Sequence, residues 1–333
     1  MDLYLEMKER SMYTFTRWLD NKLFTLEEVE KLLIMDHPDD IPGSGAQYLN
    51  WKIVKVFPEN KSGMFNGRQI TYNYYSFSVD QIPGGSEPMD DGTYTKSGFV
   101  VPYFSSGRVR YIISRNTYAQ TFLRKMLFYS GKGEVVSNAV EFSGDMFVWL
   151  ISKVYSGETV FSNESDFLDD LGVDSIKGFK GNTEDLLAKV TVTGESVMNI
   201  LSALSFLIES RNLNQITIDL SYRRHLNMEI LLNNRNTIGF NEDSYIGELN
   251  QKPREEVIAT CLILLYTEIL PIIIQKYQSD IDENLWGQGK CVEFLKRVAA
   301  DLNDQINTRI NDLVSRPEQL RVTINPEDNS ISI

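Results

Sequence analysis

The sequence has few of the side chains that most often bind zinc or carry out nucleophilic catalysis. Its 333 residues include two histidines, His37 and His225, and two cysteines, Cys261 and Cys291. A cysteine-based zinc site needs more ligands than these four side chains easily supply. A Ser-His-Asp or Cys-His arrangement would have to use one of the two histidines. Two cysteines in so long a chain fit a reducing compartment, so we expect a cytoplasmic protein.

Glycine-rich loops that bind phosphates are missing as well. Residues 287–290, Gly-Gln-Gly-Lys, follow Asn284, which stands where a Walker-type loop needs its first glycine. No Gly-x-Gly-x-x-Gly pattern follows a strand, and no Gly-x-Ser-x-Gly elbow occurs. The sequence therefore gives no support for dinucleotide binding or for a serine hydrolase. We expect no cofactor, except the Mg²⁺ of the nuclease alternative described below.

Positive charge is in short supply over the whole chain. The sequence has 46 acidic and 33 basic residues, a net charge of −13. This balance argues against bulk coating of nucleic acid and against adhesion to anionic membranes, but it permits a local basic patch. The long apolar run 257–274 contains Glu268 and Pro271 and is flanked by acidic residues. We therefore expect a buried core helix that is kinked at Pro271, and no membrane span.

The basic residues that are present gather in one segment. Residues 99–133 contain six Lys and Arg side chains and no Asp or Glu. Arginine neutralises phosphates, and aromatic rings stack on unpaired bases, so this segment is predicted to contact DNA, RNA or another phosphate-bearing or acidic partner. The predicted contact residues are Arg108, Arg110, Arg115, Arg124 and Lys125 for charge, and Tyr103 and Tyr111 for stacking.

The basic segment also has a structural interpretation. Residues 134–185 contain eleven acidic residues and three lysines, so they are able to neutralise the basic segment within one molecule. Contact with a partner would make the chain a non-enzymatic binding protein, for which microbial defence against foreign DNA is a plausible role. If the acidic residues of the same molecule neutralise the basic segment, that segment has a structural role and does not contact an external partner.

A short pattern of acids and a lysine offers an enzymatic alternative. Asp39 is followed by Glu59-Asn60-Lys61, which resembles the Asp…Glu-x-Lys arrangement of restriction-like nucleases. In that arrangement two carboxylates hold Mg²⁺ and the lysine steadies the attacking water. There the Glu and Lys lie on a strand, whereas Pro58 here follows the predicted strand 50–57. A metal-dependent nuclease that uses Asp39, Glu59 and Lys61 is the alternative function.

Hydrophobic periodicity predicts an α+β protein with two parts. Residues 1–161 are expected to form a mostly antiparallel sheet with flanking helices, and residues 162–185 an acidic linker. The expected elements of the first part are a helix over 11–35, strands over 50–57, 68–80, 99–104 and 108–114, and a helix over 116–129.

Residues 186–333 are predicted to form a β-α-β-β-β unit closed by two long helices. Its expected elements are strand 187–193, helix 194–210, strands 216–220, 228–232 and 237–240, helices 253–278 and 282–315, and a hairpin over 320–333. The apolar stripe of helix 282–315 predicts packing against helix 253–278 or a homodimer seam. A protein-only adaptor or oligomer is therefore a third hypothesis.

Overall fold

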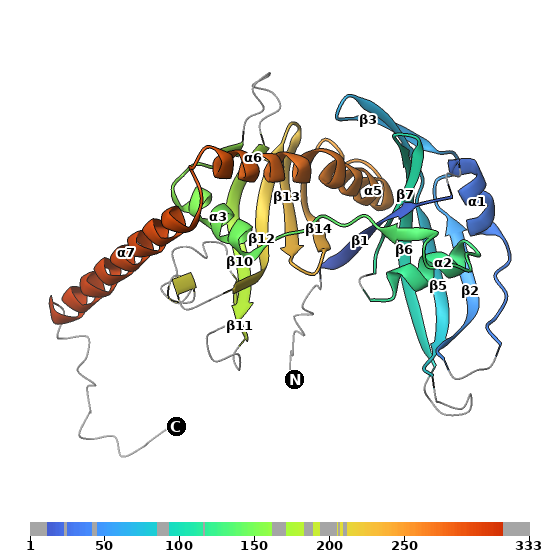
Figure 1. Ribbon diagram of the computed structural model, residues 1–333, viewed down its shortest axis with the longest axis horizontal. Coiled ribbons are helices and arrows are strands. Elements are labelled where there is room, and N and C mark those ends of the chain that lie inside the picture. Colours follow the sequence, from blue (N-terminus) through green and yellow to red (C-terminus); the bar gives the residue numbers. More distant parts are fainter. Residues whose placement is uncertain are drawn as a thin grey trace, which may run out of the picture.

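In the computed structural model, the described strands pair antiparallel and form one connected sheet, with helices on its faces (Figure 1). The structure describes residues 12–22, 25–41, 45–84, 93–115, 117–161, 171–182, 189–193, 205, 207–208 and 212–315. Over these residues the sheet has 14 strands, with the main order β11-β10-β12-β13-β14-β1-β7-β6-β4-β3. The expected α+β class with a mostly antiparallel sheet is confirmed.

The sheet has two halves, which we name by their strands. The N-terminal half contains β1 (Tyr13–Asp20), β2 (Gln47–Lys55), β3 (Lys61–Phe65), β4 (Arg68–Tyr72), β5 (Tyr75–Ile82), β6 (Tyr94–Ser105), β7 (Arg108–Ile113) and β8 (Val135–Ser137). The C-terminal half contains β9 (Val160–Phe161), β10 (Leu171–Asn182), β11 (Lys189–Thr193), β12 (Asn212–Tyr222), β13 (His225–Asn233) and β14 (Thr237–Gly247).

Strand β1 joins the two halves. Its first residues, from Tyr13 to Phe15, pair with β14, and the following ones, from Thr16 to Leu19, pair with β7. The predicted helix 11–35 is therefore wrong over its first half. Helix α1 (Leu26–Ile34) begins only after Thr25, whose hydroxyl and Glu28 form a capping box. The apolar spacing fitted a helix, but pairing on both sides fixes this segment as a strand.

The predicted strand 68–80 is divided into β4 and β5 by a buried asparagine. The Asn73 side chain donates to the Phe57 carbonyl (3.1 Å) and to Asn60 Oδ1 (2.8 Å). These bonds tie the break between the two strands to the turn that follows β2. A polar side chain that bonds to nearby backbone competes with ladder pairing, which explains the break.

Two short helices cover one face of the N-terminal half. Helix α1 and helix α2 (Ala119–Met126) enclose a core with the inward residues of β6 and β7. Val29 and Leu33 of α1 and Leu123 of α2 are fully buried there. The second expected helix of this region, 116–129, is confirmed with shorter bounds.

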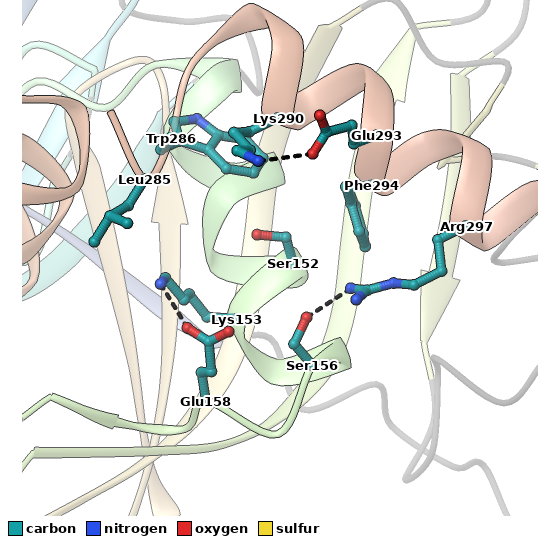
Figure 2. Close-up of a pocket in the computed structure, with 10 residues that line it drawn as sticks. All are labelled: Ser152, Lys153, Ser156, Glu158, Leu285, Trp286, Lys290, Glu293, Phe294 and Arg297. Atoms are coloured by element: carbon teal, nitrogen blue, oxygen red, sulfur yellow. Dashed lines mark hydrogen bonds and ion pairs between the residues drawn. The ribbon is translucent and has the colours of Figure 1, made fainter. Parts of the chain in front are cut away.

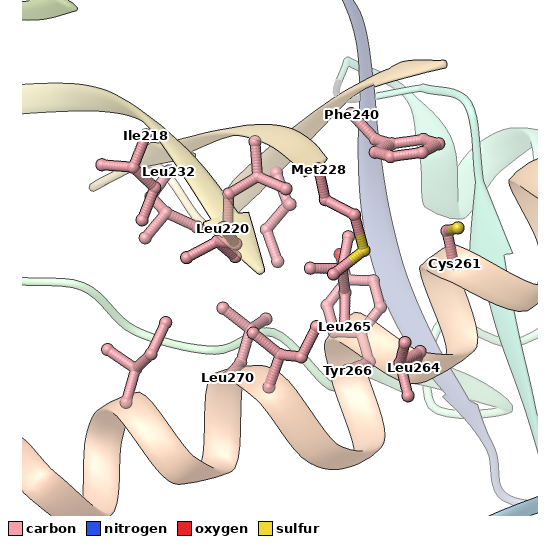
Figure 3. Close-up of a cluster of buried hydrophobic side chains, with 14 of the residues drawn as sticks. Ile218, Leu220, Met228, Leu232, Phe240, Cys261, Leu264, Leu265, Tyr266 and Leu270 are labelled. Carbon is pink, nitrogen blue, oxygen red and sulfur yellow. The ribbon is translucent and has the colours of Figure 1, made fainter. Parts of the chain in front are cut away.

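One long helical segment extends along the other side of the sheet. It consists of α5 (Arg254–Leu264), the π-helical turn η2 (Leu265–Ile269) and α6 (Leu270–Asp282). In Figure 3 its residues Leu264, Leu265 and Leu270 lie near side chains of the C-terminal half, including Leu220. The segment is apolar and long enough to span a membrane, and 72% of its most apolar window is buried in the protein. The expected kink at Pro271 stays a prediction; the structure has the π-helical turn η2, which ends at Ile269, two residues before the proline.

Helix α3 (Gly144–Tyr155) and helix α7 (Gln288–Ser315) complete the described fold. Helix α3 lies against β10 and β12. The first half of α7 packs on α3 through the buried residues Phe294 and Val298, and packing against helix 253–278 stays a prediction. Residues 303–315 of α7 are exposed and project from the body of the molecule (Figure 1). The homodimer seam on this helix stays a prediction.

The predicted division into 1–161, 162–185 and 186–333 also stays a prediction. The structure places α3, from the first of these parts, on strands β10 and β12 that lie beyond it. Of the predicted helix 194–210 the structure describes residues 205, 207 and 208, which are helical. The predicted hairpin 320–333 lies outside the described residues.

Candidate anion-binding site

Strand alternation gathers arginine side chains on one face of the N-terminal half. In the sheet register Arg110 of β7 stands between Leu19 of β1 and Tyr103 of β6. Since successive side chains of a strand point to opposite faces, Arg17 and Arg108 share the face of Arg110. Strand β4 adds one more, because its Tyr72 pairs with Tyr103. The arginines of this face are Arg17, Arg68, Arg108 and Arg110.

Three of these side chains, Arg17, Arg68 and Arg110, line a cavity of about 170 Å³. Tyr103 and Thr267 also line it. A cavity of this size has room for a phosphate, sulfate or carboxylate group.

Two tight turns hold the rim of this cavity. Asn66 and Gly67 connect β3 to β4 with φ values of 46° and 67°, and Ser106 and Gly107 connect β6 to β7 with φ values of 53° and 73°. Positive φ at both central residues is the hairpin turn that matches strand twist, and it favours Asn-Gly and similar pairs. Arg68 Nη1 donates to Ser106 Oγ (3.0 Å), which links the two turns.

Replacing Gly67 with alanine should destabilise the protein by about 1 kcal/mol. A Cβ atom at this position meets no atom within 4 Å, so the cost comes from the left-handed backbone alone. Gly133 is the matched control, because a Cβ there also meets open space and its φ is outside the left-handed range. Urea denaturation measures the free energy of unfolding of both variants. Equal losses for Gly67→Ala and Gly133→Ala would contradict the backbone explanation.

The arginines of the cavity donate to neutral acceptors. Arg17 Nε donates to the Asn138 carbonyl (2.7 Å) and its Nη1 to the Tyr266 carbonyl (3.2 Å). Arg110 donates to the Ser105 carbonyl. Among the residues that the structure describes, no Asp or Glu oxygen lies within 4 Å of a guanidinium nitrogen of Arg17, Arg68 or Arg110. Over the part of the chain that the structure describes, the cavity therefore carries positive charge without a carboxylate partner.

A buried tyrosine adds a polar group to the wall of the cavity. Tyr103 is fully buried, and its hydroxyl lies beside the Arg17 guanidinium without a geometrically complete hydrogen bond to a described residue. Burial raises the pKa of Tyr103, and the charges of Arg17 and Arg110 oppose this shift. The hydroxyl therefore stays protonated at neutral pH and is able to donate to an anion.

The predicted stacking role of two tyrosines needs correction. Stacking on a base requires an exposed ring, whereas Tyr103 and Tyr111 are both fully buried. The Tyr111 hydroxyl donates to Asp20 Oδ2 (2.5 Å) inside the core. Both tyrosines occupy buried positions on the paired strands β6 and β7. In the sequence, buried tyrosines that alternate with basic residues look the same as tyrosines of an exposed binding surface.

The other predicted basic residues do not line the cavity. Lys125 pairs with both oxygens of Asp40 (2.6 and 2.7 Å). Arg115 donates to the Ser97 carbonyl (2.6 Å), and burial lowers its pKa. The other two predicted residues also donate to uncharged acceptors. Arg108 donates to Asn21 Oδ1, and Arg124 donates to the Ser130 carbonyl.

Internal neutralisation by the acidic segment is not seen where both segments are described. Over residues 99–115 and 117–133 on one side, and 134–161 and 171–182 on the other, no ion pair joins the two segments. Glu134 pairs with Lys22 instead, and Lys125 with Asp40. Among the residues that the structure describes in these two segments, Arg110 has no acidic partner.

The structure gives the predicted nuclease residues separate contacts. Asp39 accepts a hydrogen bond from the Asn50 backbone amide (2.7 Å), and Lys61 lies 3.4 Å from Glu256 of α5. Glu59 is exposed at a bend. Within the described part of the chain, no group of three or more His, Cys, Asp and Glu side chains is arranged to hold a metal ion. The nuclease hypothesis and its Mg²⁺ stay a prediction.

Sequence reasoning missed the π-helical turn that borders the cavity. Within η2, Thr267 lines the cavity and Glu268 is 3% exposed. Glu268 accepts from the Asn66 amide (2.6 Å) and the Tyr222 hydroxyl (2.7 Å), and Arg223 lies 2.9 Å away. Single π-helical turns are frequent at functional sites. The signal in the sequence was an acid inside an apolar run.

A larger cavity, of about 460 Å³, lies between α3 and α7 and is drawn in Figure 2. Two of its three cations, Lys153 and Lys290, are paired with carboxylates, and the third, Arg297, has a neutral acceptor. Lys153 contacts Glu158 (2.7 Å), Lys290 contacts Glu293 (2.9 Å), and Arg297 donates to Ser156 (2.6 Å). This cavity has a larger volume than the cavity of the three arginines. We nevertheless take the cavity of the three arginines as the candidate site, because its positive charge indicates the class of ligand, an anion.

Comparison with known proteins adds no family to this geometry. Neither a family model nor a curated protein matches the chain. The chemistry of the site is therefore argued from its own residues.

Proposed function

We propose that this chain is a non-enzymatic binding protein that holds the anionic group of a phosphate-bearing or acidic partner between Arg17, Arg68 and Arg110. The observation that carries the proposal is the cavity of these three arginines, which has no carboxylate partner among the described residues. Guanidinium groups bind phosphate and carboxylate through paired, charge-assisted hydrogen bonds. Arg68 is exposed and Arg17 and Arg110 are half-buried, so their guanidinium groups are accessible to such an anion.

Nucleic acid is one source of phosphate for this site. Arg108 lies on the same strand face as Arg110 and is partly exposed, so it would extend a phosphate contact beyond the cavity. The buried rings of Tyr103 and Tyr111 remove the predicted stacking contacts. A DNA or RNA partner, and with it a role in microbial defence, would have to bind through phosphates alone. Such binding falls steeply as salt rises.

Titration calorimetry with sodium phosphate tests the proposal. The wild-type protein should bind phosphate, and Arg110→Gln and Arg68→Gln should each weaken binding about tenfold or more, because each removes charge-assisted hydrogen bonds. Arg235→Gln is the control, since Arg235 is exposed in the turn between β13 and β14 and does not line the cavity. Absence of phosphate binding, or an equal loss in the control, would overturn the proposal. Parallel titrations with short DNA and RNA oligonucleotides test the nucleic-acid source.

A further inference from the structure

Arg17 lines a second cavity as well as the cavity of the three arginines. This second cavity, of about 780 Å³, is a shallow groove along the outer side of α6. Its apolar lining includes Val140, Tyr266, Pro271 and Ile274. Since Arg17 lines both cavities, an anionic group that contacts its guanidinium lies at the border of the groove.

The residues along α6 give the groove its direction. Pro271, Gln275, Gln278 and Asp282 are exposed and recur every three or four residues, so they form one helix face. This face begins next to the turn whose Tyr266 carbonyl accepts from Arg17. The distance along the helix from Tyr266 to Asp282 is about 24 Å at 1.5 Å per residue. The groove therefore runs from a basic end to the C-terminal end of α6.

The far end of the groove is acidic. Asp282 and Glu283 both line it and are exposed. Asp282 accepts from Gln278 (2.9 Å) and Glu283 from Ser279 (2.6 Å), and within the described residues neither has a Lys or Arg nitrogen within 4 Å. The groove thus has Arg17 at one end, apolar side chains in the middle and carboxylates at the other end.

We infer that the groove binds an extended peptide segment of a partner protein. The anionic group of the segment, a phosphorylated side chain or a C-terminal carboxylate, lies between Arg17, Arg68 and Arg110, and a Lys or Arg lies near Asp282 and Glu283. An extended chain covers about 3.4 Å per residue, so about seven residues separate the two charges. The inference rests on the proposed function, because it takes the cavity of the three arginines as the anchor.

The charge order of the groove favours a peptide over other anionic partners. A nucleic-acid strand carries a phosphate on every nucleotide, so it would place further negative charges beside Asp282 and Glu283. An acyl chain gains nothing from the carboxylates and amides that follow Ile274. A peptide is able to present opposite charges at the two ends and apolar side chains between them, which matches all three parts of the groove.

Selection from peptide libraries tests the inference. One library carries a fixed central phosphoserine with eight random residues on each side, and a second carries a free C-terminal carboxylate after sixteen random residues. The immobilised full-length protein should enrich Lys and Arg at least fivefold at positions five to eight residues from the anionic group. The double variant Asp282→Lys with Glu283→Lys should enrich Asp and Glu there instead. Asp304→Lys, an exposed acid on α7, is the control and should leave the wild-type preference unchanged.

Each outcome separates the two proposals. Phosphate binding by calorimetry with no basic preference in either library, or a preference that the double variant does not reverse, would overturn the peptide inference and leave the proposed function standing. Loss of phosphate binding would overturn both. The two libraries distinguish a phosphorylated segment from a chain terminus. Tighter binding of an oligonucleotide than of the selected peptides would assign the groove to nucleic acid and reject the peptide.

Discussion

Replacing Asp280 with alanine should lower the free energy of unfolding by about 3–5 kcal/mol. The Asp280 side chain is fully buried, 2.8 Å from Lys153 and 2.9 Å from Lys276, and it accepts from the Trp149 indole (3.0 Å). Its removal leaves the buried Trp149 indole without this acceptor and leaves Lys153, whose side chain is 13% exposed, with the exposed Glu158 as its remaining partner. Urea denaturation at pH 7, followed by tryptophan fluorescence, measures the loss. Asp304→Ala, an exposed acid, should change stability by less than about 0.5 kcal/mol; a similar small effect for Asp280→Ala would contradict the expectation.

The same carboxylate should make stability depend on acid pH. Burial raises the pKa of Asp280, but hydrogen bonds from Lys153, Trp149 and Lys276 outweigh it, and the pKa is lowered overall. A lowered folded pKa means that the stabilisation is fully present above the unfolded pKa of about 3.9. It is lost as pH falls through the lower folded value. In Asp280→Asn this part of the pH dependence should disappear. The measurement is the free energy of unfolding of both proteins from pH 7 to pH 3. If the free energy of Asp280→Asn changes with pH as steeply as that of the wild-type protein, the assignment is contradicted.

Replacing Glu268 with alanine should cost about 3 kcal/mol and should also weaken phosphate binding. Glu268 joins the Asn66 turn of the N-terminal half to Tyr222 and Arg223 of the C-terminal half. Its loss leaves the Asn66 amide without that acceptor and frees the rim of the cavity of the three arginines. Urea denaturation measures stability, and calorimetry with phosphate measures binding.

The control for Glu268→Ala is Glu141→Ala. Glu141 is exposed, so this variant should leave both stability and phosphate affinity close to wild type. A Glu268→Ala protein that unfolds at the wild-type urea concentration would show that the two halves do not depend on this carboxylate. A destabilised protein with wild-type phosphate affinity would show that Glu268 supports the fold without shaping the cavity.

Local patterns in the sequence were sufficient for elements with strong alternation. The strand-turn-strand unit around Ser106 and Gly107, and the three strands β12 to β14, are confirmed because polar and apolar residues alternate along them and turn residues separate them. The segment of β1 was predicted as a helix, because its apolar spacing also fits a helical period. Its pairing with β7 and β14 makes this segment a strand, and both partner strands are distant in sequence.

The candidate site shows the same limit. Arg110 was predicted as a contact residue from the local excess of basic side chains, but Arg17 and Arg68 were missed. They stand in segments of mixed charge, and the sheet register alone brings them to Arg110. Tyr103 was predicted for the wrong chemistry, because burial decides whether a tyrosine presents its ring or only its hydroxyl.

The position of β1 has a consequence for the order of assembly during synthesis. This strand leaves the ribosome early, whereas its partner β14 is made more than two hundred residues later, since Phe15 pairs with Ile238. Pairs so distant form slowly, because loop closure opposes them. Until β14 emerges, the amides and carbonyls of residues 13–15 stay unpaired on a growing nascent chain, where an open strand edge invites association with other chains. Translation pauses before β14 would lengthen this exposure.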